Sequence, residues 1–302
     1  MSVAELEAQE LQLEAPSGLW RDAWWQVRHN PGAIVGFTFV FAFAFCGIFA
    51  PLLAPYSPTQ TNLGLMAHGC CPGPSHAHWL GVDIVGRDEF SRVLYGARYS
   101  LIIGVVSVAV GLSVGLVLGS VAGFVGGVLD SAIMRTMDVM LAIPGFLLAL
   151  GIVAMLGQGL RQVMIAVGVA NIPIFARLLR GSVLAQREND FVLAARSVGV
   201  RRRAILFSHI LPNAISPVIV QGTLALATAI IDVAGLSFLG LGDPDPSHSE
   251  WGAMLTDADQ YLQNAPFLAI VPGIAIVISA LGFNLIGDAL REALDPKLRG
   301  RT

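Results

Sequence analysis

The chain has 302 residues, of which 55% are hydrophobic and only 13% are charged, and its formal net charge is −3. A soluble globular domain carries about 25% charged residues, so this composition argues against that class and favours a protein that crosses a membrane. The near-neutral charge argues against binding to nucleic acid, and three cysteines are too few for a disulfide framework.

The N-terminal part of the chain predicts a cytoplasmic tail followed by one membrane span. Residues 1–30 begin with acidic side chains, unlike the basic start of a signal peptide. Between Arg28 and Asp83 the sequence contains no Asp, Glu, Lys or Arg. We therefore predict a first helix at about 32–55, within a span region 31–58, which is retained in the mature protein.

The rest of the chain predicts an external segment, a five-helix core and a short tail. Residues 59–98 form the external segment, 99–292 form the core, and 293–302 form a cytoplasmic C-terminal tail. The expected helices of the core lie at about 99–123, 132–156, 162–180, 209–235 and 267–288. The fold prediction is thus an all-α bundle of six transmembrane helices, with both ends of the chain on the same side.

Basic residues predict which side of the bundle is cytoplasmic. The side that holds both termini carries Arg21, Arg28, Arg135, Arg177, Arg180, Arg187, Arg196, Arg201, Arg202, Arg203, Arg291, Lys297, Arg299 and Arg301, and the opposite side carries Arg87, Arg92, Arg98 and Arg161. Fourteen basic residues against four place both termini and the loop 181–208 in the cytoplasm.

Glycine and proline mark where the helices approach one another or bend. Gly111, Gly115, Gly119, Gly123 and Gly127 recur every four residues, so the first four share one helix face. This pattern predicts close contact with another helix, in the same bundle or in a second subunit. Proline interrupts four other spans, at Pro144, Pro173, Pro217 and Pro272, and predicts kinks there.

The cytoplasmic loop 181–208 contains a short segment that is suited to docking a soluble partner. Asn189 or Asp190 is the expected N-cap of a helix at about 190–200. At helical spacing Phe191, Ala194, Ala195 and Val198 share one face, and Gly199 ends the helix. Its composition alone also fits an ordinary positively charged cytoplasmic loop.

The order of residues in this segment resembles the "EAA" loop of bacterial ABC importer permeases. The matching residues are Leu193-Ala194-Ala195, Gly199, and Leu211-Pro212. In that family the loop forms a coupling helix that is seated in a cleft of the ATP-hydrolysing subunit. Here Leu193 replaces the Glu of the motif and His209 replaces an Ile.

The resemblance assigns the ATPase coupling to Leu193, Ala194, Ala195 and Gly199, and Pro212 with Asn213 links the coupling helix to the fifth span. On this basis Ala195→Arg is expected to block uptake without preventing membrane insertion.

Most of the remaining chain is similar to the second, "C-type" permease of the dipeptide, oligopeptide and nickel importers. The similar segments are Arg21–Trp24, Asn30–Pro31, Phe49–Tyr56, Leu80–Asp83, Gly86–Asp88, Ser91–Arg92, Tyr95–Arg98, Ala234–Gly242, Glu250–Leu255, Phe283–Asp288 and Leu294–Arg299. The resemblance implies one half of a translocation pathway for di- or oligopeptides in the bacterial inner membrane, working by alternating access.

The implied partners are a second permease, two ATP-binding subunits or one fused double ATPase, and an extracytoplasmic peptide-binding protein. ATP and Mg are then bound by the partner subunits, and this chain binds no cofactor. The sequence has one lysine, Lys297, and no Gly-Lys-Ser/Thr phosphate loop, so we expect the chain not to be an enzyme.

Four residues are candidates for the translocation pathway, namely Asp232, Ser237, Phe238 and Asn284. An acid near the outer end of a span avoids lipid, so Asp232 either attracts the ammonium group of a peptide or bonds within the bundle. Asn284 fits an interhelical hydrogen bond at least as well as a cargo contact. Asp138 is expected to pair with Arg135, three residues earlier.

The external loop contains His68, Cys70, Cys71, His76 and His78. The spacing matches no standard zinc module, so we predict no metal site and expect a loop with an oxidised cysteine pair. Nickel or haem nevertheless stays open as an alternative cargo, because relatives of the same architecture carry them. An ion-driven secondary transporter and a scaffold subunit are the alternatives from other classes.

Overall fold

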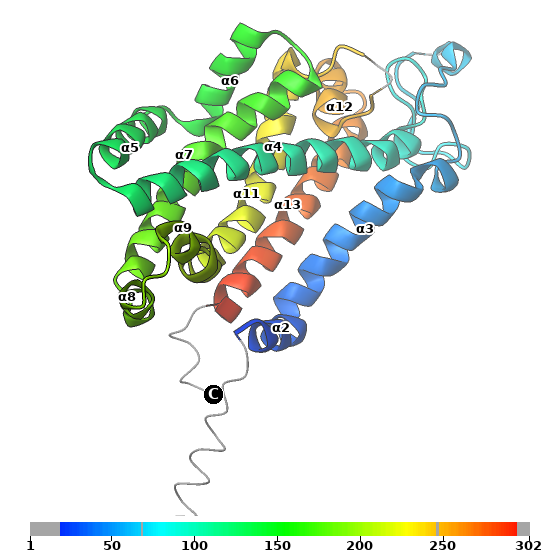
Figure 1. Cartoon of the computed structure of the whole chain (residues 1–302). Coiled ribbons are helices and arrows are strands. Elements are labelled where there is room, and N and C mark those ends of the chain that lie inside the picture. Colours follow the sequence, from blue (N-terminus) through cyan, green and yellow to red (C-terminus); the bar gives the residue numbers. More distant parts are fainter. Residues whose placement is uncertain (1–18, 68, 246–247, 295–302) are drawn as a thin grey trace, which may run out of the picture.

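The computed structural model describes residues 19–67, 69–245 and 248–294, and these are almost entirely helical (Figure 1). The elements in chain order are α2 (Leu19–His29), α3 (Pro31–Leu53), η1 (Leu63–Met66), α4 (Glu89–Val125), α5 (Gly127–Leu141), α6 (Gly145–Leu156), α7 (Leu160–Arg187), α8 (Asp190–Ser197), α9 (Arg202–Ala204), η2 (Ile205–Ile210), α10 (Leu211–Ala214), α11 (Ser216–Leu236), η3 (Ser237–Leu241), α12 (Trp251–Ala258), η4 (Asp259–Tyr261) and α13 (Phe267–Leu294). In the described ranges the β structure is limited to one isolated bridge, between Val82 and Asp88. The all-α prediction is confirmed.

Five continuous helices are long and apolar enough to cross a membrane: α3, α4, α7, α11 with η3, and α13. The third predicted span, at 132–156, corresponds to the pair α5 and α6, which is bent by 91° and makes six spans if the pair counts as one. The bend lies at Pro144, the N-cap of α6. Proline has no N–H to donate and disfavours the helical conformation of the residue before it, here Ile143.

Several predicted boundaries need correction. Helix α4 starts ten residues earlier than expected, at Glu89, because the Asp88 carboxylate caps it by accepting a hydrogen bond from Ser91 N at 2.8 Å. Helix α7 continues to Arg187. Pro217 lies in the first turn of α11, where no helical N–H bond is lost, so it does not interrupt that span. The residues 1–18 and 295–302 of the two predicted tails lie outside the described residues.

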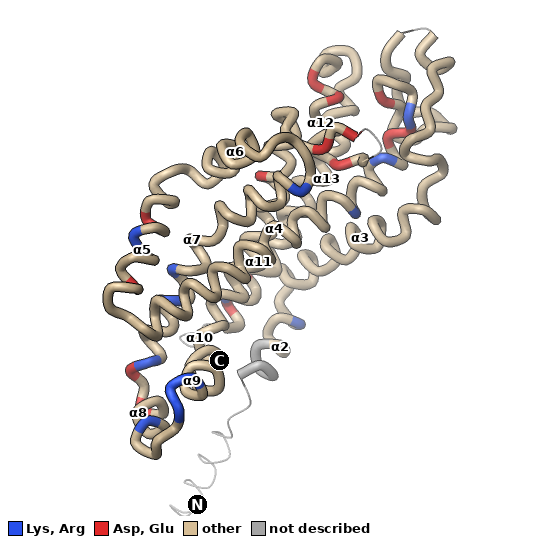
Figure 2. Tube along the Cα trace, turned by 45° about the horizontal axis from the view of Figure 1, so that its top comes forward, with Lys and Arg blue, Asp and Glu red and all other residues tan. Residues whose placement is uncertain are grey.

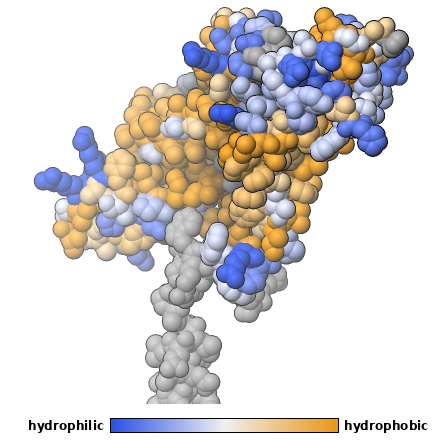
Figure 3. Space-filling view, turned by 90° about the vertical axis from the view of Figure 1, so that its right-hand side faces the viewer, coloured by the Kyte–Doolittle hydropathy of each residue, from blue (hydrophilic) through white to orange (hydrophobic). Residues whose placement is uncertain are grey.

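The surface of the bundle has an apolar belt between two polar ends. In Figure 3 the hydrophobic colour covers the middle of the visible face, and the hydrophilic colour gathers near the ends. Figure 2 shows the charged residues concentrated towards the ends of the long helices. On α3, Phe41, Ile48 and Leu52 are well exposed, as expected for side chains that contact lipid tails.

The glycine stripe of α4 packs against α7 in the same chain. A β-carbon on Gly115 would lie 2.5 Å from Phe175 Cβ, and one on Gly119 would lie 2.5 Å from Ala176 O. Both distances are too short for any side chain, so the stripe lets two helix backbones approach closely. Of the two interpretations left open by the sequence, the structure supports packing within one bundle.

Gly115→Ala is expected to destabilise the protein by about 1–3 kcal/mol, because the added methyl group must push α4 away from Phe175. Gly181→Ala is the matched control in α7, where a β-carbon meets no atom within 4 Å. The control should be neutral or stabilising by up to about 1 kcal/mol, since alanine favours a helix. Thermal unfolding of the purified protein measures both; equal melting temperatures for the two variants would contradict the packing argument.

Candidate functional site

The predicted docking segment forms a separate short helix at one end of the bundle. Helix α8 follows α7 after two linking residues and lies at the tip of the molecule (Figure 1). Its N-cap is Asn189, one of the two predicted residues, although the Asn189 side chain donates to Gln186 Oε1 at 2.8 Å and makes no cap hydrogen bond. The segment is therefore a distinct short helix beside the end of α7.

Helix α8 has one buried face and one exposed face. Val192 and Ala195 pack into the main core of this chain, and Ala195 is only 7% exposed. Ala194, Leu193 and Val198 are exposed, Val198 to 80%. The predicted common face is thus wrong for Ala195, because the tertiary packing of Val192 turns that side of the helix inward. An arginine at Ala195 would disrupt this packing as well as any docking.

Gly199 ends α8 by its backbone conformation. Its φ is +79°, a region that glycine enters without steric cost. Val200 N donates to Ala195 O at 3.1 Å, and Gly199 N donates to Arg196 O at 3.0 Å. This pair of bonds is a Schellman motif, so Gly199 fixes the length and exit direction of α8.

The connection from α8 to the next span passes through η2, a π-helical turn, and then α10. Ile205 and Ile210 are buried in the main core and anchor this connection. Pro212 and Asn213 lie exposed in α10, where Asn213 Nδ2 donates to His209 O at 2.7 Å. The chain between α8 and α11 is therefore packed and mostly helical.

The four candidate pathway residues lie at different depths and share no hydrogen bond or ion pair in the described part of the chain. Asp232 is half-buried in α11, and Asn284 is exposed on α13. Gly287, three residues after Asn284 on α13, lies against Leu224 of α11. Asp232 follows Leu224 by eight residues, so it lies about 12 Å along α11 from that contact.

Ser237 and Phe238 belong to the junction between α11 and α12. Ser237 is buried, and its carbonyl oxygen accepts a hydrogen bond from Thr256 Oγ1 at 3.0 Å. The Phe238 side chain is 42% exposed. Ser237 is thus packed inside the protein, and of the two residues only Phe238 has an exposed side chain.

At the opposite end of the bundle from α8, ion pairs fix the external segment to α12. The Asp83 carboxylate accepts from Arg87 Nε at 2.5 Å and from Arg92 Nη1 at 2.6 Å. The same two guanidinium groups contact Asp257 of α12, at 3.2 and 3.0 Å. Asp83, Arg87 and Arg92 are all buried. Together with the half-buried Asp257 these residues form a charge network that we call the outer ion cluster.

Glu250 caps α12 beside this cluster. Its carboxylate accepts from Gly252 N at 2.9 Å and from Ala253 N at 3.0 Å. Burial raises the pKa of the Glu250 carboxyl, and the two backbone N–H groups oppose that shift. Glu250 therefore fixes where α12 begins.

In the external loop the adjacent residues Cys70 and Cys71 bring their sulfur atoms together, and their oxidation stays a prediction. Among the described residues no group of three His, Cys, Asp or Glu side chains is placed to hold a metal ion. His68 lies outside the described residues.

The two acidic residues of α5 form ion pairs with arginines of α7 and not with basic residues nearby in the sequence. Asp138 contacts Arg177, so the predicted Asp138–Arg135 pair is wrong. Asp130 Oδ1 accepts from Arg180 Nε at 2.6 Å. Both pairs join α5 to α7, which a prediction from local spacing could not find.

Two family models match the chain. "N-terminal TM domain of oligopeptide transport permease C" matches residues 18–68, and "Binding-protein-dependent transport system inner membrane component" matches residues 115–300. The second match covers more than half of the sequence and includes α8 and the connection to α11. The chain belongs to the binding-protein-dependent transport inner membrane components. It is a multi-pass permease of the ABC importer type.

Relatives with similar sequences cover nearly the whole permease. It is 46% identical to the dipeptide transport system permease protein DppC of Alkalihalophilus pseudofirmus, over 93% of this chain and 90% of that protein. It is 49% identical to the glutathione transport system permease protein GsiD of Salmonella paratyphi A, over 93% and 91%. A chain of the inward-facing MetNI methionine ABC transporter shares the fold, with a TM-score of 0.55 and 19% identity over 67% of this permease and 96% of that chain.

Sequence patterns missed two features of this permease. One is the outer ion cluster, whose partners are up to 174 residues apart (Asp83 to Asp257). The other is a cationic cavity behind α8, described below. Finding either feature requires the tertiary structure. The four basic residues on the external side were the one indication of the outer ion cluster in the sequence, since the external side carries few basic residues.

Proposed function

We propose that this permease forms one half of the translocation pathway of an ATP-driven importer of short peptides, paired with a second permease. The observation that carries the proposal is its high identity, over almost its whole length, to a dipeptide permease and a glutathione permease. Glutathione is itself a tripeptide derivative, so both relatives point to the same class of cargo. An extracytoplasmic binding protein delivers the peptide to the end that carries the outer ion cluster.

In this proposal α8 is the coupling helix and its exposed face docks on an ATP-binding subunit. Ala194 is small and exposed between Phe191 and Val198, so a partner surface can approach closely there. Leu193 replaces an acidic motif residue, and an apolar contact takes the place of a salt bridge. Two ATP-binding subunits, or one fused double ATPase, bind ATP and Mg, and this chain hydrolyses nothing itself.

The excess of basic residues supports a cytoplasmic position for α8 and both termini. When the ATP-binding subunits close, α8 moves and transmits the movement through η2 and α10 to α11. Along the pathway, half-buried Asp232 attracts the peptide ammonium group and exposed Phe238 contacts cargo near the outer mouth. Asn284 lies deeper, on α13.

The test is transport by the reconstituted complex in vesicles with its binding protein. We expect uptake of labelled di- and tripeptides that requires ATP and the binding protein. Uptake of nickel or haem without peptide uptake would replace the cargo proposal. Peptide uptake driven by an ion gradient without any ATPase subunit would contradict the importer mechanism, and undiminished uptake with this chain omitted would leave it only a scaffold role.

A further inference from the structure

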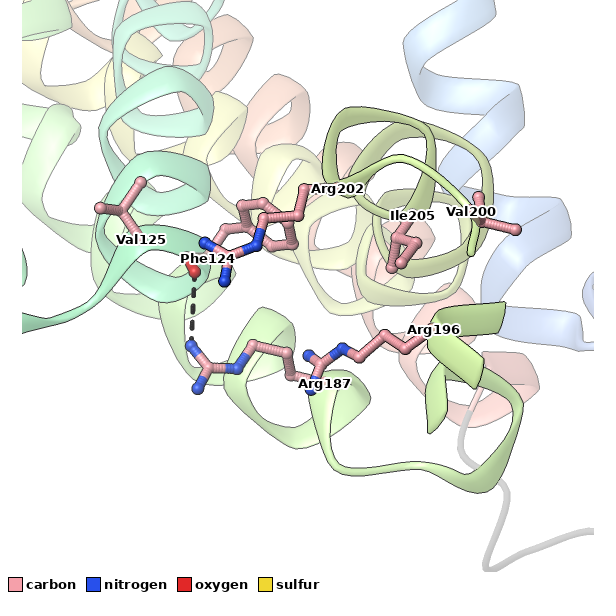
Figure 4. Close-up of a pocket in the computed structure, with 7 residues that line it drawn as sticks. All are labelled: Phe124, Val125, Arg187, Arg196, Val200, Arg202 and Ile205. Carbon is pink, nitrogen blue, oxygen red and sulfur yellow. Dashed lines mark hydrogen bonds between the residues drawn. The ribbon is translucent and has the colours of Figure 1, made fainter. Parts of the chain in front are cut away.

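Behind α8 lies a cavity lined by three arginines. It has a volume of about 410 Å³ and is lined by Phe124, Val125, Arg187, Arg196, Val200, Arg202 and Ile205. Figure 4 shows the guanidinium groups of Arg187, Arg196 and Arg202 reaching this cavity from three different elements. The end of α7, the coupling helix α8 and α9 each contribute one cation.

The positive charge of this cavity is poorly compensated inside the chain. Arg187 Nη1 donates to Gly123 O and Phe124 O, at 3.2 and 3.4 Å, at the C-terminal end of α4. Its Nε is buried without a hydrogen-bond partner and lies 3.8 Å from Glu188, whose side chain is 79% exposed. Within the described ranges no acidic side chain pairs with Arg196 or Arg202. Three guanidinium groups around one space repel one another, and an anion between them would relieve that repulsion.

The cavity lies on the side of α8 that faces away from the docking surface. Arg196 is exposed and lines the cavity, and it follows Val192 by four residues, so it lies beside Val192 on the helix surface. The exposed docking residues Ala194 and Val198 are on the other side. A ligand in the cavity and an ATP-binding subunit on α8 can therefore be present together.

On one side the cavity meets apolar residues at the end of a membrane span. Val125, which lines the cavity, ends α4, and Val128 follows in the first turn of α5 with 87% exposure. Leu129 beside it is also exposed. Exposed aliphatic side chains next to a cationic cavity suit an amphiphile with an anionic head and an acyl tail.

We propose that this cavity binds the phosphodiester headgroup of an anionic phospholipid. Guanidinium groups form paired, charge-assisted hydrogen bonds with phosphate oxygens. Basic pockets between membrane helices at the cytoplasmic surface recognise such headgroups. The acyl chains lie along Val125 and Val128, while the phosphate joins α7, α8 and α9. The site is independent of the cargo and would stand if the transported substrate were not a peptide.

Native mass spectrometry of the delipidated transporter complex, titrated with short-chain phosphatidylglycerol, tests this site. We expect the wild type to bind phosphatidylglycerol more tightly than phosphatidylcholine. The double variant Arg196→Gln/Arg202→Gln should bind phosphatidylglycerol at least about tenfold more weakly. The matched control is Arg201→Gln/Arg203→Gln, which removes the same charge from the same loop but lies outside the cavity lining. It should bind like the wild type.

Three results would overturn the proposal. Equal losses in the two double variants would show diffuse attraction of lipid to a basic loop. Inorganic phosphate that binds as tightly as phosphatidylglycerol would assign the cavity to a soluble anion. Loss of the ATP-binding subunits from the cavity variant, seen in the same spectra, would assign the arginines to a protein contact. The single variant Arg202→Gln repeats the test if the double variant melts at a lower temperature.

Discussion

Ala194→Arg should abolish ATP-driven uptake while the permease still inserts and folds. Ala194 is exposed on α8, so a longer side chain can extend into solvent, and arginine is a good helix former. A large charged side chain in the middle of a close protein contact costs about 2 kcal/mol or more, which is about thirtyfold in affinity. The complex should therefore lose its ATP-binding subunits during purification, together with transport.

Ala204→Arg is the matched control for this variant. Ala204 is an exposed alanine of the same cytoplasmic region, in α9, and it does not belong to α8. Uptake and subunit recovery should match the wild type. If Ala194→Arg also transports normally, with its ATP-binding subunits retained, then α8 is not the coupling helix. An arginine at the buried Ala195 would disturb the packing of α8 itself, whereas one at the exposed Ala194 tests docking alone.

The sequence predicted those parts of the fold that depend on local composition. Charge-free stretches longer than a bilayer located α3 and α13 closely, because hydrocarbon excludes charged side chains over a fixed length. The docking helix was also predicted at nearly its observed bounds, since Asn189 and Gly199 are strong start and stop signals.

Other parts needed the tertiary structure. Helical spacing put Ala195 with Phe191 and Ala194, but which side of a short helix is buried depends on what packs against it, here the core around Val192. From the sequence, the 91° bend between α5 and α6 could not be distinguished from a small kink within one helix at Pro144. Ionic contacts such as Asp138 with Arg177 join residues far apart in sequence, so local spacing pointed to the wrong partner.

The second large effect is expected at the outer ion cluster, where Asp83→Asn should destabilise the permease by about 3–5 kcal/mol. The Asp83 carboxylate is buried and is the partner that both Arg87 and Arg92 share at the shortest distances. An asparagine removes the carboxylate that pairs most closely with the two buried guanidinium groups, and their other ion-pair partner, Asp257, is 33% exposed. Removing one partner of a buried ionic group costs far more than losing a surface pair, because the remaining charge stays away from water.

Thermal unfolding of the purified complex measures this effect, and two further variants locate its origin. Asp257→Asn should cost less than Asp83→Asn, since Asp83 still pairs with both arginines and the half-buried site of Asp257 admits water. Asp259→Asn removes an exposed acid just after α12 and should change the melting temperature little. If all three variants melt alike, the cluster does not hold the external segment against α12. The expected order instead makes Asp83 the residue that joins the external segment to the membrane bundle, and α12 the surface on which it rests.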